Sequence, residues 1–306
     1  MIATDEYDLL TRDAAMVDRS ARTKVLVTGG EAPDFLQGQV TNDVEALEPG
    51  RGCYAALLSH KGKLRADLRV LRTGEGFWID AEEIARRVVL HVLETYSLGR
   101  DVSWEDLTED RAILSLLGPR ARDRLDLAPP AEEHSFVEGE HGLYVATDLG
   151  VDVVCDASDA AAVRAALGVE EVSEEVAECL RIESGRPRLG LDMGSETIPQ
   201  EAGLNERAVS FSKGCYVGQE TVARLHYKGK PNRHLRGLRL SAPASTGEPI
   251  LLGERQVGTV GSVCVSPRLG PIALAVIRRE AGPGDTVHVG ARGADAEVVE
   301  LPFGDS

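Results

Sequence analysis

The sequence predicts an α+β fold with sheet and helix layers, followed by a separate all-β domain at the C-terminus. Up to about residue 220, short apolar strand patterns alternate with helical patterns, as in sheets that are covered by helices. Beyond residue 231 only short strand patterns remain, and glycine and proline separate them at nearly even spacing. A length of 306 residues suits two or three domains.

The elements of the first part follow from local patterns. Strand candidates are apolar or β-branched runs that end at turn residues, and helix candidates carry apolar residues at helical spacing. The predicted strands cover residues 24–28, 53–58, 68–71, 112–117, 144–147, 151–155 and 208–211. The predicted helices cover residues 31–39, 81–98, 119–125, 158–167 and 173–184, and a helix or ordered loop is expected over 217–225. We expect Ser173 to cap the helix that it begins.

The C-terminal part shows no helical period. Its predicted strands cover residues 235–240, 248–252, 256–266, 272–278, 287–289 and 296–301, a pattern typical of a small barrel or sandwich. We therefore place the domain boundary near residue 230, which divides the chain into residues 1–230 and 231–306.

Composition excludes several classes of function. The chain has 34 basic and 50 acidic residues and a net charge of −16, which disfavours binding to nucleic acids and anionic membranes. The N-terminus lacks a secretory pattern, and the longest clean apolar runs are far too short to span a membrane. Five cysteines without metal-ligand spacing argue against a structural metal site and for a reducing compartment. We expect a cytoplasmic monomer.

The charge reverses locally between residues 213 and 236. This stretch carries six basic residues and one acid, Glu220. One interpretation is a solvated basic loop. The other is a site for a small polyanion such as a tail of linked carboxylates, which lysine and arginine bind through charge-assisted hydrogen bonds.

The octet Lys-Gly-Cys-Tyr-Val-Gly-Gln-Glu at residues 213–220 is the most informative segment. It follows a strand-like run and precedes a helical one, so Cys215 is expected at a bend. A helix N-terminus and nearby cations, here Lys213 and Arg224, both lower the pKa of a thiol. The alternative is an inert, partly buried cysteine.

Two acids stand in unusual settings. Glu201 lies in a loop bounded by proline and glycine, where its carboxylate could accept two N–H groups from an amidine-like edge such as that of a pterin; alternatively it is an exposed loop acid. Asp67 lies in a predicted strand, where acids are disfavoured, on the face opposite Leu68 and Val70. It is either a solvent-facing residue or a functional one.

Three motifs together resemble the YgfZ-type folate-binding proteins, relatives of the glycine-cleavage T-protein that act in iron–sulfur cluster assembly and repair. These motifs are KGCYVGQE at 213–220, IPQEAGL at 198–204 and FLQGQVTNDV at 35–44. The octet is specific to this group, whereas the other two motifs are shared with T-protein relatives. The resemblance implies a GcvT-like ring of three domains, with two interleaved α+β domains followed by a C-terminal β-barrel.

The resemblance also implies a ligand and site residues. Tetrahydrofolate, or a one-carbon derivative of it, would bind in the central opening, and Cys215 would be the functional thiol beside it. Glu201 is similar to the folate-recognising acid of related transferases, and Asp67 to one of their central acids. The remaining cofactor-binding residues that it implies are Asn42, Asp43, Lys213, Tyr216, Gln219, Glu220 and Arg224.

One departure bears on activity. T-proteins carry paired acids where this chain has Ala66 and Asp67, and they lack the octet. We therefore expect a folate-binding protein, not a classical enzyme, that uses Cys215 to support iron–sulfur enzymes, including tRNA-modifying ones, as transient partners. The alternative is a folate-dependent aminomethyl transferase of the T-protein type. A thiol redox enzyme is a weaker third possibility, because Cys215 has no second cysteine nearby in sequence.

Overall fold

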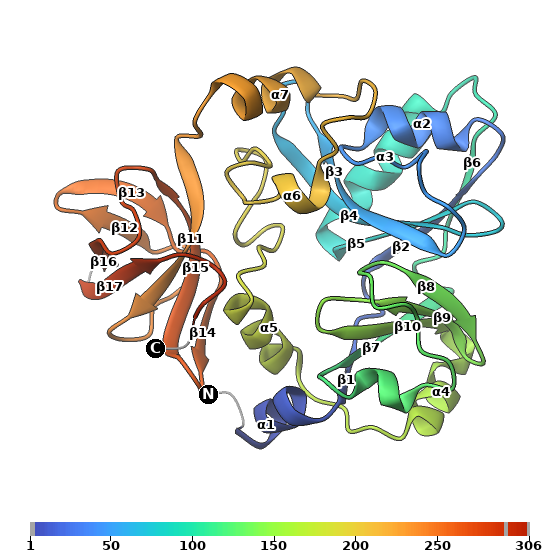
Figure 1. Cartoon of the computed structure of the whole chain (residues 1–306), viewed down its shortest axis with the longest axis horizontal. Helices are drawn as coiled ribbons and strands as arrows, with labels where there is room; N and C mark the ends of the chain where they lie inside the picture. Colours follow the sequence, from blue (N-terminus) through green and yellow to red (C-terminus); the bar gives the residue numbers. More distant parts are fainter. Residues whose placement is uncertain (1–3, 291–292, 305–306) are drawn as a thin grey trace.

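The computed structural model describes residues 4–290 and 293–304. Figure 1 shows three domains arranged as a ring, with two α+β domains on one side and a β domain on the other. The helix α5 (Glu174–Glu183) lies between the lower α+β domain and the β domain.

The first α+β domain contains an antiparallel sheet with the strand order β3-β4-β5-β2-β6. The helices α2 and α3 pack on this sheet, and two later helices, α6 and α7, return to the same domain. The strands are β2 (Thr23–Thr28), β3 (Arg51–Leu58), β4 (Leu64–Arg72), β5 (Phe77–Ala81) and β6 (Ser103–Asp106). The helices are α2 (Ala32–Gln39), α3 (Arg86–Tyr96), α6 (Asn205–Ala208) and α7 (Gln219–Lys228).

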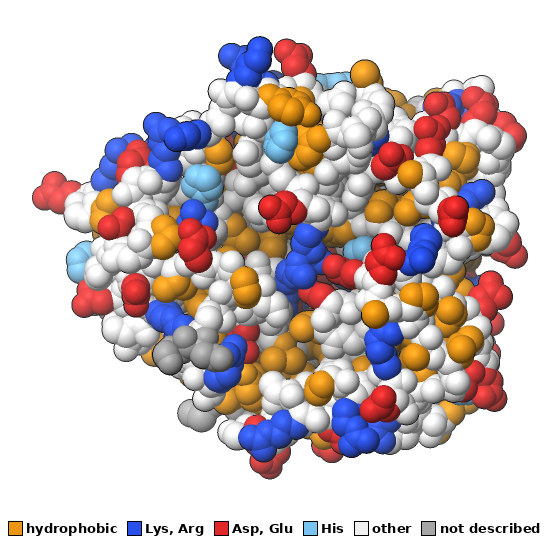
Figure 2. Space-filling model, viewed as in Figure 1, with side chains coloured by type: hydrophobic (Ala, Val, Ile, Leu, Met, Phe, Trp, Pro, Cys, Tyr) orange, Lys and Arg blue, Asp and Glu red, His pale blue; other side chains and the backbone are white. Residues whose placement is uncertain are grey.

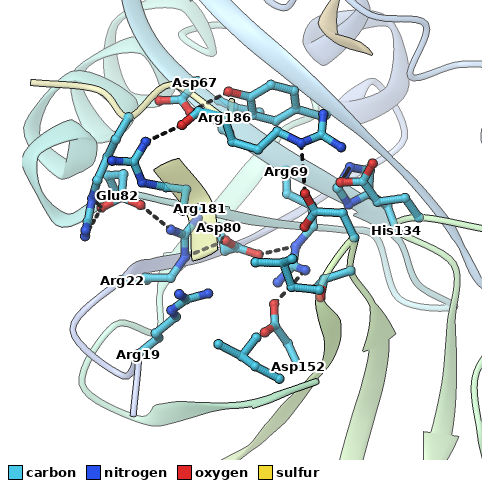
Figure 3. Close-up of a pocket in the computed structure, with 18 of the residues that line it drawn as sticks. Arg19, Arg22, Asp67, Arg69, Asp80, Glu82, His134, Asp152, Arg181 and Arg186 are labelled. Atoms are coloured by element: carbon cyan, nitrogen blue, oxygen red, sulfur yellow. Dashed lines mark hydrogen bonds and ion pairs between the residues drawn. The ribbon is translucent and has the colours of Figure 1, made fainter. Parts of the chain in front are cut away.

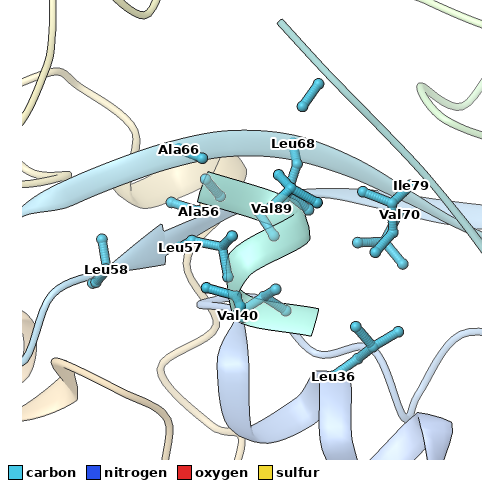
Figure 4. Close-up of a cluster of buried hydrophobic side chains, with 14 of the residues drawn as sticks. Leu36, Val40, Ala56, Leu57, Leu58, Ala66, Leu68, Val70, Ile79 and Val89 are labelled. Atoms are coloured by element: carbon cyan, nitrogen blue, oxygen red, sulfur yellow. The ribbon is translucent and has the colours of Figure 1, made fainter. Parts of the chain in front are cut away.

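Alternation along β4 gives this sheet its two faces. Leu64, Ala66 and Leu68 are buried in the apolar cluster that Figure 4 shows between the sheet and its helices. Because side chains alternate along a strand, Asp67 and Arg69 lie on the opposite face, toward the middle of the ring. The apolar face therefore stabilises the layer, and the polar face is left free for a site.

The second α+β domain is interleaved with the first. Its sheet has the order β1-β7-β10-β9-β8, and β1 precedes the whole first sheet in the chain. The strands are β1 (Ala15–Asp18), β7 (Arg111–Leu117), β8 (Phe136–Gly139), β9 (Gly142–Ala146) and β10 (Gly150–Asp156). The helices α1 (Thr4–Arg12) and α4 (Ala160–Leu167) pack with it, together with α5. This arrangement confirms the expected fold class.

The C-terminal domain is a seven-stranded antiparallel sheet with the order β13-β12-β16-β17-β11-β15-β14. It begins directly after α7, which ends at Lys228. The strands are β11 (Arg233–Leu240), β12 (Pro249–Leu252), β13 (Arg255–Thr259), β14 (Val263–Ser266), β15 (Gly270–Arg278), β16 (Thr286–Val289) and β17 (Ala294–Val299).

Some local predictions were wrong. Residues 208–211 are not a strand, because α6 ends at Ala208 and an irregular bend follows. The predicted helix 81–98 begins only at residue 86, since residue 81 still pairs within the sheet. The run 256–266 is two strands separated by a turn. Ser173 precedes α5, but its hydroxyl donates to Glu6 Oε2 (2.9 Å) instead of capping the helix.

A buried chain of ion pairs joins the two α+β domains. Asp80 on β5 accepts from Arg22 Nη2 (2.7 Å) and from Arg69 Nε (2.5 Å). Arg69 Nη1 reaches across to Asp152 Oδ2 on β10 of the second domain (2.8 Å). Asp152 Oδ1 also accepts the hydroxyl of Ser115 at 2.6 Å. The two sheets are thus held together by polar contacts as well as by apolar ones.

The charges of this chain are mutually compensated. Burial alone would raise the pKa of Asp80, but Arg69 and Arg22 outweigh it and hold that pKa at about 2. Because this folded-state pKa lies below the usual value, the ion pairs stabilise the fold above about pH 4 and are lost as the pH falls toward 2.

We predict that Arg69→Met destabilises the protein strongly. The substitution keeps much of the side-chain volume but leaves Asp152 without its guanidinium partner and Asp80 with only one. Breaking such a buried pair costs about 3 kcal/mol of unfolding free energy, measurable by urea denaturation at pH 7. The matched control is Arg87→Met, because Arg87 is exposed on α3. Equal stability of the two variants would contradict the role of the chain.

Candidate functional site

A cavity of about 360 Å³ lies where the two α+β domains meet α5. Figure 3 shows that charged side chains from both sheets point into it, and Figure 2 shows acidic and basic side chains crowded in the hollow at the middle of this face. Its volume falls in the lower range of small-molecule sites. Its lining includes Tyr54, Asp67, Arg69, His134, Glu178, Arg181 and Arg207.

Asp67 is the predicted site residue that lines this cavity. Its Oδ2 accepts the hydroxyl of Tyr54 at 2.6 Å, while its buried Oδ1 has no partner among the described residues. Burial raises the pKa of the Asp67 carboxyl, although the hydrogen bond from Tyr54 opposes this. A carboxylate with one oxygen already hydrogen-bonded and the other without a partner can accept a hydrogen bond from an N–H group of a ligand, or take up a proton from it.

Arg207 and His134 lie beside Tyr54 in the cavity lining. The guanidinium of Arg207 lies 5.2 Å from the centre of the Tyr54 ring, and the His134 ring lies 6.4 Å away. His134 has a left-handed backbone (φ 68°), which is uncommon outside glycine. Burial, then the charges of Arg69 and Arg207, lower the pKa of His134 to about 3, so its ring is neutral. A neutral imidazole can donate or accept one hydrogen bond.

The end of the octet packs closely against the turn between β3 and β4. Gly218, in the left-handed conformation (φ 84°), precedes α7, and a Cβ there would lie 2.5 Å from the carbonyl oxygen of Ser59. Only glycine permits this approach. The octet therefore sits against the hairpin that carries Asp67, but its residues are not among those that line the central cavity.

Lys213 holds the octet in place. Its buried Nζ donates to the carbonyl oxygens of Gln37, Val40 and Asn42 at 2.6, 2.8 and 2.8 Å. These contacts use all three N–H donors of the ammonium group, so the geometry gives Lys213 a structural role. Burial lowers its pKa to about 8. Tyr216 is buried beneath this group, with its ring centre 5.2 Å from Nζ.

Cys215 stays exposed on the bend that these contacts fix. The octet does not line the cavity described above, and the expectation that Cys215 lies beside a folate in the central opening stays a prediction. Lys213 turns inward to the end of α2 and Tyr216 is buried, so the two residues between them, Gly214 and Cys215, are exposed. The thiol is accessible to a partner, and its function stays a prediction.

The remaining predicted residues have contacts within the protein. Glu201 is buried and pairs with Arg233 through both oxygens (3.0 and 2.7 Å), which ties its loop to β11. Asn42 donates to the Tyr54 carbonyl at 2.8 Å, and Asp43 accepts from the Gln37 amide at 2.9 Å. Their predicted roles in binding folate remain untested. Three others belong to α7 and are partly or fully exposed: Gln219, Glu220 and Arg224.

The basic stretch is divided in the structure. Lys213 is caged by carbonyls, Arg233 is paired with Glu201, and Arg236 lies 3.2 Å from Glu300. The other three bases of the stretch are exposed at and after α7: Arg224, Lys228 and Lys230. Half of the six bases are thus engaged within the protein, and the predicted polyanion site stays a prediction.

Sequence reasoning missed most of the cavity. The Arg69 and Asp80 positions carried a signal, because charges inside otherwise apolar strands are disfavoured unless they are paired. His134 carried no such signal, since it lies in a polar loop that only the fold brings to Tyr54.

In the described ranges no three metal-binding side chains form a cluster. Across those same ranges, no helix has the length and apolarity that a membrane span requires.

Comparison with known proteins identifies two domains. Residues 1–140 match the GCVT N-terminal domain, and residues 233–305 match the glycine cleavage T-protein C-terminal barrel domain. A protein named aminomethyltransferase from Saccharopolyspora erythraea is 29% identical over 97% of this chain and 89% of its own. A putative chloroplastic transferase of Arabidopsis thaliana is 26% identical over 98% of this chain and 73% of its own.

A solved structure shares the whole fold. The glycine cleavage system aminomethyltransferase T from Bartonella henselae superimposes with a TM-score of 0.89 and covers 98% of this chain and 89% of its own, at 24% identity. This likeness establishes the GcvT-like architecture.

We predict that Asp67→Asn stabilises the ligand-free protein at pH 7. Because burial raises the folded-state pKa of Asp67 above its unfolded value, the favourable contribution of the protonated form is present below about pH 4 and lost at neutral pH. An amide keeps the shape without the buried charge. Urea unfolding should show a gain at pH 7 that shrinks toward pH 4. A loss of stability at pH 7 would contradict this account.

Proposed function

We propose that this chain, T-protein-like by both matched domains and by its fold, binds a reduced folate in the central cavity and catalyses folate-dependent one-carbon transfer. Relatives that align with nearly the whole chain are named aminomethyltransferases, which supports transfer of an aminomethyl-type group. The earlier expectation of a non-enzymatic protein has no support in these relatives.

The observation that carries the proposal is the free oxygen of Asp67. A buried polar atom without a partner is costly, so its retention in a cavity suggests that a ligand satisfies it. The 2-amino and N3 groups of a pterin, or an amine of the folate, are N–H donors that suit this acceptor. Tyr54 would keep the carboxylate oriented through the other oxygen.

The chemistry required of this chain is modest. Bound tetrahydrofolate supplies the nitrogen nucleophiles that accept a one-carbon unit. Asp67 can take up or return a proton at Oδ1, and its raised pKa brings it closer to the range of an acid–base group at neutral pH. Ala66 stands where T-proteins have the first acid of the pair, so Asp67 would act without a neighbouring carboxylate at that position.

We predict that Asp67→Ala abolishes the transfer while the fold persists. Purified protein would be incubated with tetrahydrofolate and an aminomethylated lipoyl carrier, and methylenetetrahydrofolate would be measured. Loss of one acid–base group lowers the rate by about 100-fold or more. The matched control is Asp110→Ala, because Asp110 is exposed and lies outside the cavity lining.

Isothermal titration with tetrahydrofolate separates binding from chemistry. No binding to the parent protein would refute the proposal as a whole. Binding without turnover of the lipoyl carrier would leave a folate-binding protein and refute the transferase. Including Glu201→Ala tests its predicted role directly, because the structure pairs that acid with Arg233 instead.

A second candidate function rests on the exposed thiol. We propose as the alternative that Cys215 supports the assembly or repair of iron–sulfur enzymes, including tRNA-modifying ones. The supporting observation is that Lys213 and Tyr216 fix a bend whose outward residue is Cys215, next to a helix with exposed bases at 224 and 228. An accessible thiol of this kind suits transient contact with an acidic partner protein.

We predict that Cys215→Ser fails to restore a cluster-dependent tRNA methylthiolation enzyme in cells that lack the native gene, while aminomethyl transfer in vitro is unchanged. The separation is expected because the thiol lies outside the cavity. The control is Cys155→Ser, a buried cysteine on β10. Full rescue by Cys215→Ser would eliminate the thiol function and leave the transferase standing.

A further inference from the structure

Two cysteines from different domains meet on the barrel side of α5. Cys179 is fully buried on α5, and Cys264 is half-buried on β14. Their sulfur atoms lie 3.4 Å apart although 85 residues separate them in sequence. Figure 1 shows α5 beside β14 and β15, so this contact bridges the helix and the C-terminal domain.

The surroundings make the two thiols unequal. The hydrogen bond to Cys264, burial, and the nearby Glu183 carboxylate together raise the pKa of Cys179 well above its usual range. Glu183 Oε1 lies 3.6 Å from the Cys179 sulfur and is itself held by the Tyr7 hydroxyl at 2.9 Å. Cys264 is the more exposed sulfur, and its strand forms one end of the barrel sheet. An oxidant therefore reaches Cys264 first.

We propose that Cys179 and Cys264 are a disulfide-forming modification site that joins α5 to the barrel when the protein meets a disulfide oxidant of the glutathione class. A disulfide bond is about 2.05 Å long, so the two sulfurs must approach by somewhat more than 1 Å, which side-chain rotation can supply. Formation of this bond requires neither the proposed transferase activity nor Cys215.

The reaction is a balanced thiol–disulfide exchange. The Cys264 thiolate attacks oxidised glutathione, forms a mixed disulfide and releases one glutathione thiolate. Cys179 then passes its proton to Glu183 Oε1, which accepts its hydrogen bond at 3.6 Å, and attacks the Cys264 sulfur, which releases the second glutathione thiolate. Overall, two protein thiols are oxidised to one disulfide, and one molecule of oxidised glutathione is reduced to two of glutathione.

The bond would restrain the wall of the central cavity. Glu178, next to Cys179, and Arg181, two residues after it, line that cavity, and Arg181 Nη2 already donates to Ser262 Oγ of the barrel domain at 2.6 Å. A covalent link at Cys264, two residues after Ser262, would fix the barrel edge against the same helix. Closing a loop this long also restricts the unfolded chain, which raises stability.

The experiment incubates the full chain with a glutathione redox buffer, blocks free thiols, and maps peptides by tandem mass spectrometry. We expect a peptide pair linked through Cys179 and Cys264, a mass lower by two hydrogen atoms, and a Tm raised by about 5 °C or more that dithiothreitol reverses. Cys264→Ser should lose both effects. Cys215→Ser should retain both, because Cys215 takes no part in the contact between Cys179 and Cys264.

Two results would overturn the proposal. One is oxidised protein that carries glutathione on Cys264 without a bond to Cys179, which would mean that the side chains cannot approach. The other is the same oxidant-dependent Tm rise in Cys264→Ser. If Cys264→Ser does not fold, the peptide map of the parent protein decides alone.

Discussion

The ion chain through Asp80 and Arg69 is the constraint on which the rest of the structure depends. Two interleaved sheets meet here, and Arg69 is the group that pairs with both, through Asp80 on one side and Asp152 on the other. Because every charge in the chain has a buried partner, attraction within the pairs offsets the cost of desolvating these groups at the boundary. The central cavity exists beside this boundary and takes its charged lining from it.

A second anchoring system explains why two candidate functions arise in one chain. Lys213 donates to three carbonyl oxygens at and just after the end of α2. These contacts hold the octet against the β3–β4 hairpin. The same hairpin presents Asp67 to the cavity on its inner face. The acid and the thiol therefore share a scaffold but face different spaces. A folate reaction and a thiol-dependent partner contact are separable in such an arrangement, and neither requires the other.

The contrast between Asp67 and Glu201 shows how far sequence reasoning reaches into the site. Asp67 stood out because side chains alternate along a strand, so an acid next to the apolar Leu68 must lie on the face opposite Leu68 and Val70. Glu201 had a comparable signal in its loop, yet in the structure Arg233 of the next domain neutralises it. His134 gave no signal at all. The difference is physical: strand alternation is local, whereas an ion pair between domains depends on which segments the fold brings together.

The sequence by itself determined the fold class and the two faces of β4. These follow from periodicity and turn chemistry, which act over a few residues. Only the tertiary structure decided which polar groups remain without partners, because that depends on contacts between distant segments. It paired Glu201 with Arg233, caged Lys213, left Asp67 Oδ1 free and brought Cys179 to Cys264.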